Sequence, residues 1–181
     1  MPDKTVTAKP ILLIQLNDLY HIDTRADYTD QDTLVLPRIA TLAKRLRDFY
    51  GKDLTRFCVP GDFLAPSCLS KEFKGEQMVQ VMNLMGVDLV SFGNHEFEAG
   101  FSQADLEARM NESSFEWLNA NFAFHDEEFE QRMVDAGKMP PVHVIRTSAT
   151  HAVAIVGVLA AETPEHLGRV TDQDEAIKGI S

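Results

Sequence analysis

Residues 87–96 read Val87-Asp88-Leu89-Val90-Ser91-Phe92-Gly93-Asn94-His95-Glu96, a largely apolar run that stops at a glycine and three polar residues. The apolar part has the length of a buried strand, and the polar part has the composition of the loop that follows one. The glycine permits tight backbone geometry, the Asn94 amide oxygen can bind a metal ion, and the His95 imidazole can donate a proton. The stretch therefore predicts a strand whose carboxyl end carries reactive side chains.

Two earlier segments repeat this order of an apolar strand followed by an acidic residue. Residues 10–16 are apolar apart from Gln15 and stop at Asn17-Asp18. The short run Phe57-Cys58-Val59 leads into Pro60-Gly61-Asp62. Carboxylate, amide and imidazole groups together suit hard or borderline divalent cations such as Mn²⁺, Zn²⁺ or Mg²⁺. A lone acidic residue after a strand is most often only a turn former or a helix cap, so the argument depends on all three segments.

The segments between the predicted strands have helical spacing of their apolar residues. Residues 36–49 are predicted to form one helix, with Pro37 in its first turn, and residues 75–85 another. The apolar stripes comprise Ile39, Leu42, Ala43, Leu46 and Phe49 in the first helix and Met78, Val81, Met82 and Met85 in the second. Strands that alternate with helices indicate a layered α/β fold with a mostly parallel sheet, which binds ligands beyond the carboxyl ends of its strands.

The later part of the chain has weaker patterns. We predict a short strand at 115–122, a solvated loop or helix start at 126–128, a hairpin formed by 142–146 and 152–159, and the start of a helix at 174–181. At 181 residues the chain has the length of one domain. We therefore expect residues 1–181 to form a single domain.

Charge and cysteine content limit the function classes. The formal net charge of −11 argues against non-specific binding to nucleic acid or to a membrane surface, since both need clustered basic residues. Bound divalent cations would still let an acidic protein hold a phosphate ester. The two cysteines make neither a disulfide framework nor a zinc cluster, and the first residues have no basic signal-peptide region. We expect a cytoplasmic protein.

The order of these motifs resembles one known family. Gly93-Asn94-His95-Glu96 is similar to the signature of the calcineurin-like metallophosphoesterases. A wider set resembles the 5'-nucleotidase-like branch of that superfamily, and its segments are 59–67, Gly75, 82–88, 92–100, 117–121 and 156–164. Several motifs in the correct order argue against chance agreement, whereas a single motif supports only a hypothesis.

The resemblance implies a fold and an activity. The fold is a layered α/β/β/α sandwich, of which residues 1–181 would hold the N-terminal half as one incomplete catalytic domain. The activity is hydrolysis of phosphate esters with two divalent metal ions as cofactors, Mn²⁺, Zn²⁺, Mg²⁺ or similar. The implied substrate is a small phosphorylated molecule, a nucleotide or a related phosphomonoester, which would make the enzyme a phosphatase of nucleotide catabolism.

Carried over position by position, the resemblance assigns roles to individual residues. Asp18 binds the first metal ion, Asp62 bridges the two ions, and Asn94 binds the second ion and approaches the substrate phosphate. His95 acts at the leaving group as a general acid. Glu98 stands three residues later, where the family usually has an aspartate that orients the histidine. His95 and Glu98 are therefore the predicted catalytic dyad.

Two features depart from the family pattern. The opening motif of the family is Asp-x-His, whereas Asp18-Leu19-Tyr20-His21 puts Tyr20 in the place of the imidazole and His21 one residue later. Tyr20 and His21 are therefore candidates for a metal ligand or for a residue next to the ligands. The family's later Gly-His and Gly-His-x-His motifs are missing from this sequence, and the histidines without that context are His125, His143, His151 and His166.

Three hypotheses remain open. The first is a phosphoester hydrolase, with this chain as a fragment or as a part completed by a C-terminal polypeptide. The second is a non-catalytic relict or binding module with residual metal affinity, and the third is a purely structural α/β domain. Half a sandwich would leave an open apolar sheet face and an unpaired edge, so we also expect self-association of the isolated chain.

Overall fold

The structure is a computed structural model that describes residues 8–19, 22, 35–97, 100–160 and 177–180. Its strands are β1 (Leu12–Gln15), β2 (Thr55–Pro60), β3 (Leu89–Ser91), β4 (Glu116–Leu118), β5 (Phe122–Phe124), β6 (His143–Arg146), β7 (Ala152–Ile155) and β8 (Ile177–Ile180). Its α-helices are α1 (Val35–Tyr50), α2 (Cys68–Phe73), α3 (Glu76–Met85), α4 (Gln103–Glu112) and α5 (Glu127–Asp135). The described residues also form the short 3₁₀ helices η2 (Lys52–Leu54) and η3 (Asn94–Glu96).

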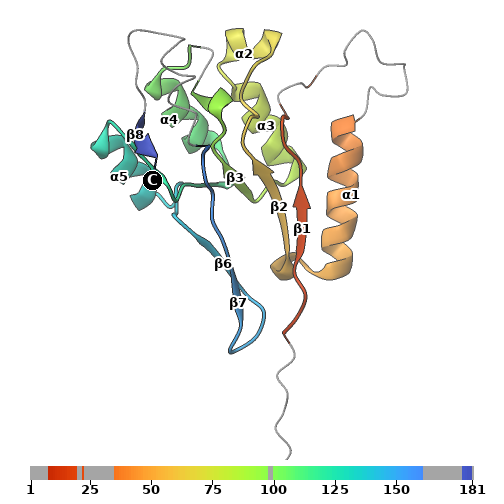
Figure 1. The fold of residues 1–181 in the computed structure, drawn as a ribbon. Helices are drawn as coiled ribbons and strands as arrows, with labels where there is room; N and C mark the ends of the chain where they lie inside the picture. The colour runs from red at the N-terminus through yellow and green to blue at the C-terminus, as the bar shows by residue number, and fades with distance from the viewer. Residues whose placement is uncertain (1–7, 20–21, 23–34, 98–99, 161–176, 181) are drawn as a thin grey trace, which may run out of the picture.

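Four parallel strands form the main sheet, in the order β1-β2-β3-β4. Figure 1 shows the arrows of β1 and β2 pointing to the same end of the sheet, with α1 and α3 beside them. Parallel strands need a crossover between them, and α1 and α3 provide it. The predicted α/β fold with a parallel sheet is confirmed, and the two further strand pairs, β5–β8 and β6–β7, are antiparallel.

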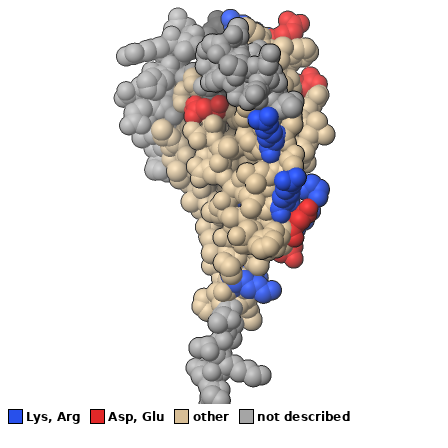
Figure 2. Space-filling view, turned by 90° about the vertical axis from the view of Figure 1, so that its right-hand side faces the viewer, with Lys and Arg blue, Asp and Glu red and all other residues tan. Residues whose placement is uncertain are grey.

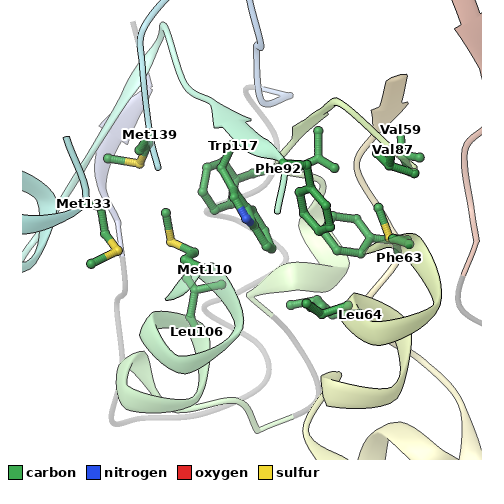
Figure 3. Packing of buried hydrophobic residues seen from close by; sticks show 14 of the residues in the cluster. Val59, Phe63, Leu64, Val87, Phe92, Leu106, Met110, Trp117, Met133 and Met139 are labelled. Carbon is green, nitrogen blue, oxygen red and sulfur yellow. The ribbon is translucent and has the colours of Figure 1, made fainter. Parts of the chain in front are cut away.

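Trp117, on strand β4 of this sheet, is fully buried in the hydrophobic core (Figure 3). Its ring centroid is 5.0 Å from that of Phe63 and 5.1 Å from that of Phe92. The indole N–H donates a hydrogen bond of 2.9 Å to Ser113 Oγ, so its polar atom is satisfied inside the core. Met110 lies beside it on α4, which joins the sheet to the helical layer. The core residues therefore pack around the strands whose carboxyl ends carry the candidate site.

The predicted helix at 36–49 is confirmed as α1, but part of its predicted apolar stripe is wrong. Ala43 is buried, whereas Leu42 is 57 % exposed and Phe49 is 81 % exposed. The helix lies against β2 and α3, so only a narrow side of it is covered. The other predicted helix, α3, places Met78, Met82 and Met85 in the core as expected, and Gly75 is its N-cap.

Two predictions in the later part of the chain need correction. Residues 115–122 contain two strand segments, β4 and the start of β5, because the chain turns at Asn119 and leaves the parallel sheet. Residues 177–180 form strand β8, whereas the sequence pattern predicts a helix there. Antiparallel pairing with β5 outweighs the local helical pattern, as tertiary context often does. The hairpin of β6 and β7 and the helix start at Asp126 are confirmed.

Figure 2 shows the molecule from the side on which Figure 1 places α1 and β1. Most of the described surface in this view is uncharged, and several basic and acidic side chains lie close together toward its right-hand side. On α1, Lys44 Nζ and Asp48 Oδ2 form an exposed ion pair with a separation of 2.6 Å. Within the described ranges, no helix has both the length and the apolar composition needed to cross a membrane.

Candidate functional site

The carboxyl ends of the first three strands bring the predicted site residues to one edge of the sheet. Asp18 follows β1, Asp62 follows β2 and Asn94 follows β3. The pairing of β1 with β2 continues past the strand, because Leu16 N–H donates to the Cys58 carbonyl oxygen at 3.2 Å. Neighbouring parallel strands end side by side, so their loops form one surface. This is the edge at which α/β sheets bind ligands.

The loops after β2 and β3 contact each other backbone to backbone. A Cβ atom on Gly61 would lie 2.6 Å from Gly93 N, and one on Gly93 would lie 2.2 Å from Asp62 Oδ1. Real Cβ contacts are never so short, so both glycines are required by the close approach rather than by a loop shape alone. Gly61 also has a φ of +87°, which favours glycine. The Asp62 carboxylate therefore lies directly over Gly93.

Asp62 and His95 are joined directly. The backbone N–H of His95 donates a hydrogen bond of 3.1 Å to Asp62 Oδ1. Asn94, between Gly93 and His95, begins the short helix η3, and its side chain is half-buried. These residues lie about thirty positions after Asp62 in the sequence, and the structure brings the two loops into contact.

The buried side chain of Glu96 stabilises the contact between the two loops. Glu96 is 1 % exposed, and its carboxylate accepts four backbone N–H groups. Oε2 accepts from Asp62 at 2.8 Å and from Gly93 at 2.7 Å. Oε1 accepts from Phe63 at 2.8 Å and from Leu64 at 3.0 Å. Burial raises the pKa of the Glu96 carboxyl above its ordinary value, and the four N–H groups act in the opposite direction.

Asp18 and Asp62 share an unusual backbone conformation. Both have positive φ, 55° for Asp18 and 57° for Asp62, and the described residues contain one other non-glycine case, Lys74. Aspartate tolerates this left-handed region better than most residues, but it still costs of order 1 kcal/mol or more and clusters at functional sites. Asp18 is exposed, and Asn17 Nδ2 donates to its Oδ2 at 2.5 Å. Both predicted metal-binding carboxylates are thus held in a conformation that needs support from their surroundings.

The described side chains fit a divalent cation in chemistry but supply only part of a ligand set. Asp18, Asp62 and Asn94 offer the oxygen atoms that hard cations prefer, and His95 offers an imidazole nitrogen. No group of three or more His, Cys, Asp or Glu side chains that could hold a metal ion occurs among the residues that the structure describes. The predicted residues Tyr20, His21 and Glu98 lie outside those residues. The described residues therefore offer candidate oxygen and nitrogen ligands for a cation.

Glu96 is the residue of this site whose role the sequence did not reveal. Its spacing from Gly93 is that of a capping box, which predicts only the bond back to the Gly93 N–H. The other three donors lie 32 to 34 positions earlier in the chain. A local pattern carries no signal for bonds between such distant segments.

Comparison with solved structures agrees with this architecture. The 5'-nucleotidase precursor from Thermus thermophilus superposes with a TM-score of 0.68 and 18 % identity, over 94 % of this chain and 32 % of that protein. The calcineurin-like phosphoesterase YfkN from Bacillus subtilis gives a TM-score of 0.61 and 14 % identity, over 93 % of this chain and 53 % of that protein. The chain has the fold of part of these proteins, and the resemblance found in the sequence is confirmed at the level of the fold.

A comparison of sequences gives a compatible result. A curated protein of Lutzomyia longipalpis, named Protein 5NUC, is 29 % identical over 126 residues, which are 70 % of this chain and 21 % of that protein. No profile of a known protein family matches the chain. The chain thus spans between about a fifth and about half of the length of the proteins it resembles.

Proposed function

We propose that this chain forms the ligand-bearing half of a metal-dependent phosphoesterase site, with a nucleotide or related phosphomonoester as the substrate class. The observation that carries the proposal is the backbone contact between the loops of Asp62 and Gly93, with the His95 N–H bonded to Asp62 Oδ1. This contact supports the proposal because it ties the Asp62 carboxylate to the backbone of the segment that carries Asn94 and His95, at the ends of β2 and β3. The fold shared with a 5'-nucleotidase precursor and a calcineurin-like phosphoesterase supports the same reaction class.

Each side chain has a separate task in this proposal. Asp18 and Asp62 would hold cations through their carboxylates, and Asn94 would hold one through its amide oxygen. Bound divalent cations supply positive charge for the phosphoryl oxygens and make water a stronger acid. His95 would give a proton to the departing alkoxide oxygen, a step worth about 10²- to 10⁴-fold in rate. The backbone N–H of His95 donates to Asp62 Oδ1, which ties the main chain of His95 to that carboxylate.

One observation favours a second candidate function, a non-catalytic module with residual metal affinity. The described residues supply fewer metal-binding side chains than a closed site needs. In that case the isolated chain would bind a cation weakly and would not turn over phosphate esters. The two candidates differ in turnover, not in metal binding, so both must be measured.

The experiment titrates the chain with Mn²⁺ in a calorimeter and assays hydrolysis of p-nitrophenyl phosphate and of glycerol 2-phosphate, on this chain and on any longer form. We expect one Mn²⁺ per chain, with binding lost in Asp62→Ala. In an active form, His95→Ala should keep Mn²⁺ binding and lose turnover, more for the glycerol ester because its alkoxide leaves less readily than nitrophenolate. His151→Ala, in the exposed hairpin turn, is the matched control.

The outcomes separate the hypotheses. Mn²⁺ binding with turnover supports the hydrolase, and Mn²⁺ binding without turnover in every form supports the binding module. Two tight Mn²⁺ sites on this chain alone would contradict the half-site. Absence of any binding that depends on Asp62 would exclude both candidates and leave the structural domain.

A further inference from the structure

We infer that Glu96 is a positioning residue of the candidate site, whose buried carboxylate fixes the loops of Asp62 and His95 relative to each other. If the proposed function holds, Glu96 governs the cation affinity of the site without contacting the cation, and this consequence rests on that proposal. The positioning itself follows from the structure alone, because the one carboxylate accepts hydrogen bonds from four backbone N–H groups.

The four donors come from two different loops. Three belong to consecutive residues after β2, Asp62, Phe63 and Leu64, and the fourth belongs to Gly93 after β3. Each carboxylate oxygen accepts two of them. Because Oε2 accepts from Asp62 and from Gly93, a single atom ties together the two backbones whose close approach defines the site. Glu96 therefore acts as a clasp between the loops.

The clasp explains the conformation of Asp62. A positive φ at a residue other than glycine persists only where the surrounding structure imposes it. The Asp62 N–H donates a hydrogen bond to Glu96 Oε2, and the Asp62 carboxylate accepts one from the His95 N–H. The residue is thus held at both its backbone and its side chain. Without the hydrogen bond to Glu96, the backbone of Asp62 can relax, and its carboxylate would move away from Gly93.

Only an ionised carboxylate meets all four donors. It offers acceptor positions on both oxygens, whereas the amide of glutamine offers acceptor positions on one oxygen and two donor hydrogens on the nitrogen. In Glu96→Gln, two of the four backbone N–H groups would therefore face an N–H₂ group of almost the same shape. This substitution tests the hydrogen bonds while it keeps the volume of the buried side chain.

The experiment first measures hydrogen exchange of the backbone amides in the wild-type chain by NMR, in metal-free buffer. The amides of Asp62, Phe63, Leu64 and Gly93 should all be protected. Glu96→Gln should lose this protection, and its Mn²⁺ affinity in calorimetry should fall about 10- to 100-fold, the range for residues that orient metal ligands. Asp88→Ala is the matched control, because Asp88 lies just before β3 and bonds Arg47 and the Phe57 N–H, away from the carboxyl ends of β2 and β3.

The control separates positioning from general stability. Asp88→Ala should lower the melting temperature while the four amides stay protected and the Mn²⁺ affinity stays unchanged. Unprotected amides in the wild-type chain would overturn the inference even if Glu96→Gln does not fold. So would unchanged protection in Glu96→Gln, or an equal loss of Mn²⁺ affinity in both variants. If the wild-type chain binds no Mn²⁺ while the amides behave as expected, the proposed function fails and the clasp stands.

Discussion

The backbone N–H of His95 donates a hydrogen bond to the side chain of Asp62, across two loops that follow neighbouring parallel strands. The bond is 3.1 Å long and runs from the main chain of one candidate functional residue to the carboxylate of another. Any displacement of the Asp62 carboxylate is therefore passed to the segment that carries His95. The geometry of the candidate site depends on this hydrogen bond and on the loop contacts that Glu96 stabilises.

Gly93→Ala should disturb the site through steric overlap alone. Gly93 has a φ of −108°, which any residue adopts, but a Cβ atom there would lie 2.2 Å from Asp62 Oδ1. We expect the Asp62 carboxylate to move away and the Mn²⁺ affinity measured by calorimetry to fall at least about 10-fold. Gly137→Ala is the control, because its Cβ meets open space and its φ of +67° brings only backbone strain. Equal Mn²⁺ affinity in the two variants would refute the close contact.

Asp88→Ala should cost far more stability than the loss of a surface ion pair. Asp88 Oδ2 accepts from Arg47 Nη2 at 2.5 Å and from the Phe57 N–H at 2.8 Å, so it joins α1 to β2. Loss of these partly buried bonds should lower the free energy of unfolding by about 1–3 kcal/mol. Asp48→Ala removes the exposed pair with Lys44 and should cost less than about 0.5 kcal/mol. Urea denaturation measures both, and similar costs would count against the structural role of Asp88.

Cys58 and Cys68 should differ in reactivity. Burial is the main cause that raises the pKa of the Cys58 thiol to about 11, and the nearby negative charge of Asp88 is the second. Cys68 is exposed. The thiolate is the reactive form, so at pH 8 only about one in a thousand Cys58 thiols is reactive. Iodoacetamide should label Cys68 first, and Cys58 only after unfolding, as read by mass spectrometry of peptides. Rapid labelling of Cys58 in the folded chain would contradict its raised pKa.

The same shift fixes the direction of a pH effect on stability. The pKa of Cys58 is higher in the folded chain than its ordinary value of 9.0. The folded state therefore keeps its proton where the unfolded state has lost it, and the contribution to stability is full below pH 9 and lost as the pH rises toward 11. Cys58→Ala should flatten this part of the stability curve relative to Cys68→Ala. A curve for Cys58→Ala as steep as that of the wild type would disprove the shift.

The parallel sheet and the strand ends that carry the candidate residues were predictable from sequence because their signals are local. An apolar run that stops at a polar residue marks both a strand and its carboxyl end, and this occurs before Asp18, Asp62 and Asn94. A helix between two such runs provides the crossover that parallel strands need, so helical spacing there favours a parallel sheet. The meeting of Asp62 with His95 follows from that topology without any knowledge of the side-chain contacts.

The parts that escaped prediction depend on contacts between distant segments. The role of Glu96 requires the backbone N–H groups of residues 62–64, and strand β8 requires its partner β5. The exposure of Phe49 on α1 depends on where the neighbouring elements end, which helical spacing does not encode. Local pattern and tertiary packing disagree at these positions, and packing prevails.

The hairpin of β6 and β7 should make the isolated chain self-associate. In the described residues these strands pair with each other alone, and the hairpin extends toward the opposite end of the sheet from the candidate site (Figure 1). Ile145 faces inward and is buried, whereas Val144 on the other face is 51 % exposed and lies opposite the exposed Ala154. An exposed apolar face with free strand edges favours pairing with a second copy.

Val144→Lys should therefore weaken self-association, because a charge on the apolar face must be desolvated when two copies meet. The measurement is the average mass by light scattering over a range of protein concentrations. Val134→Lys, at a 41 % exposed position on α5, is the control and should associate like the wild type. A wild-type chain that stays monomeric at every concentration would show that this face is tolerated in water. Equal weakening by both lysine variants would show that the added charge acts through net repulsion and not through the hairpin.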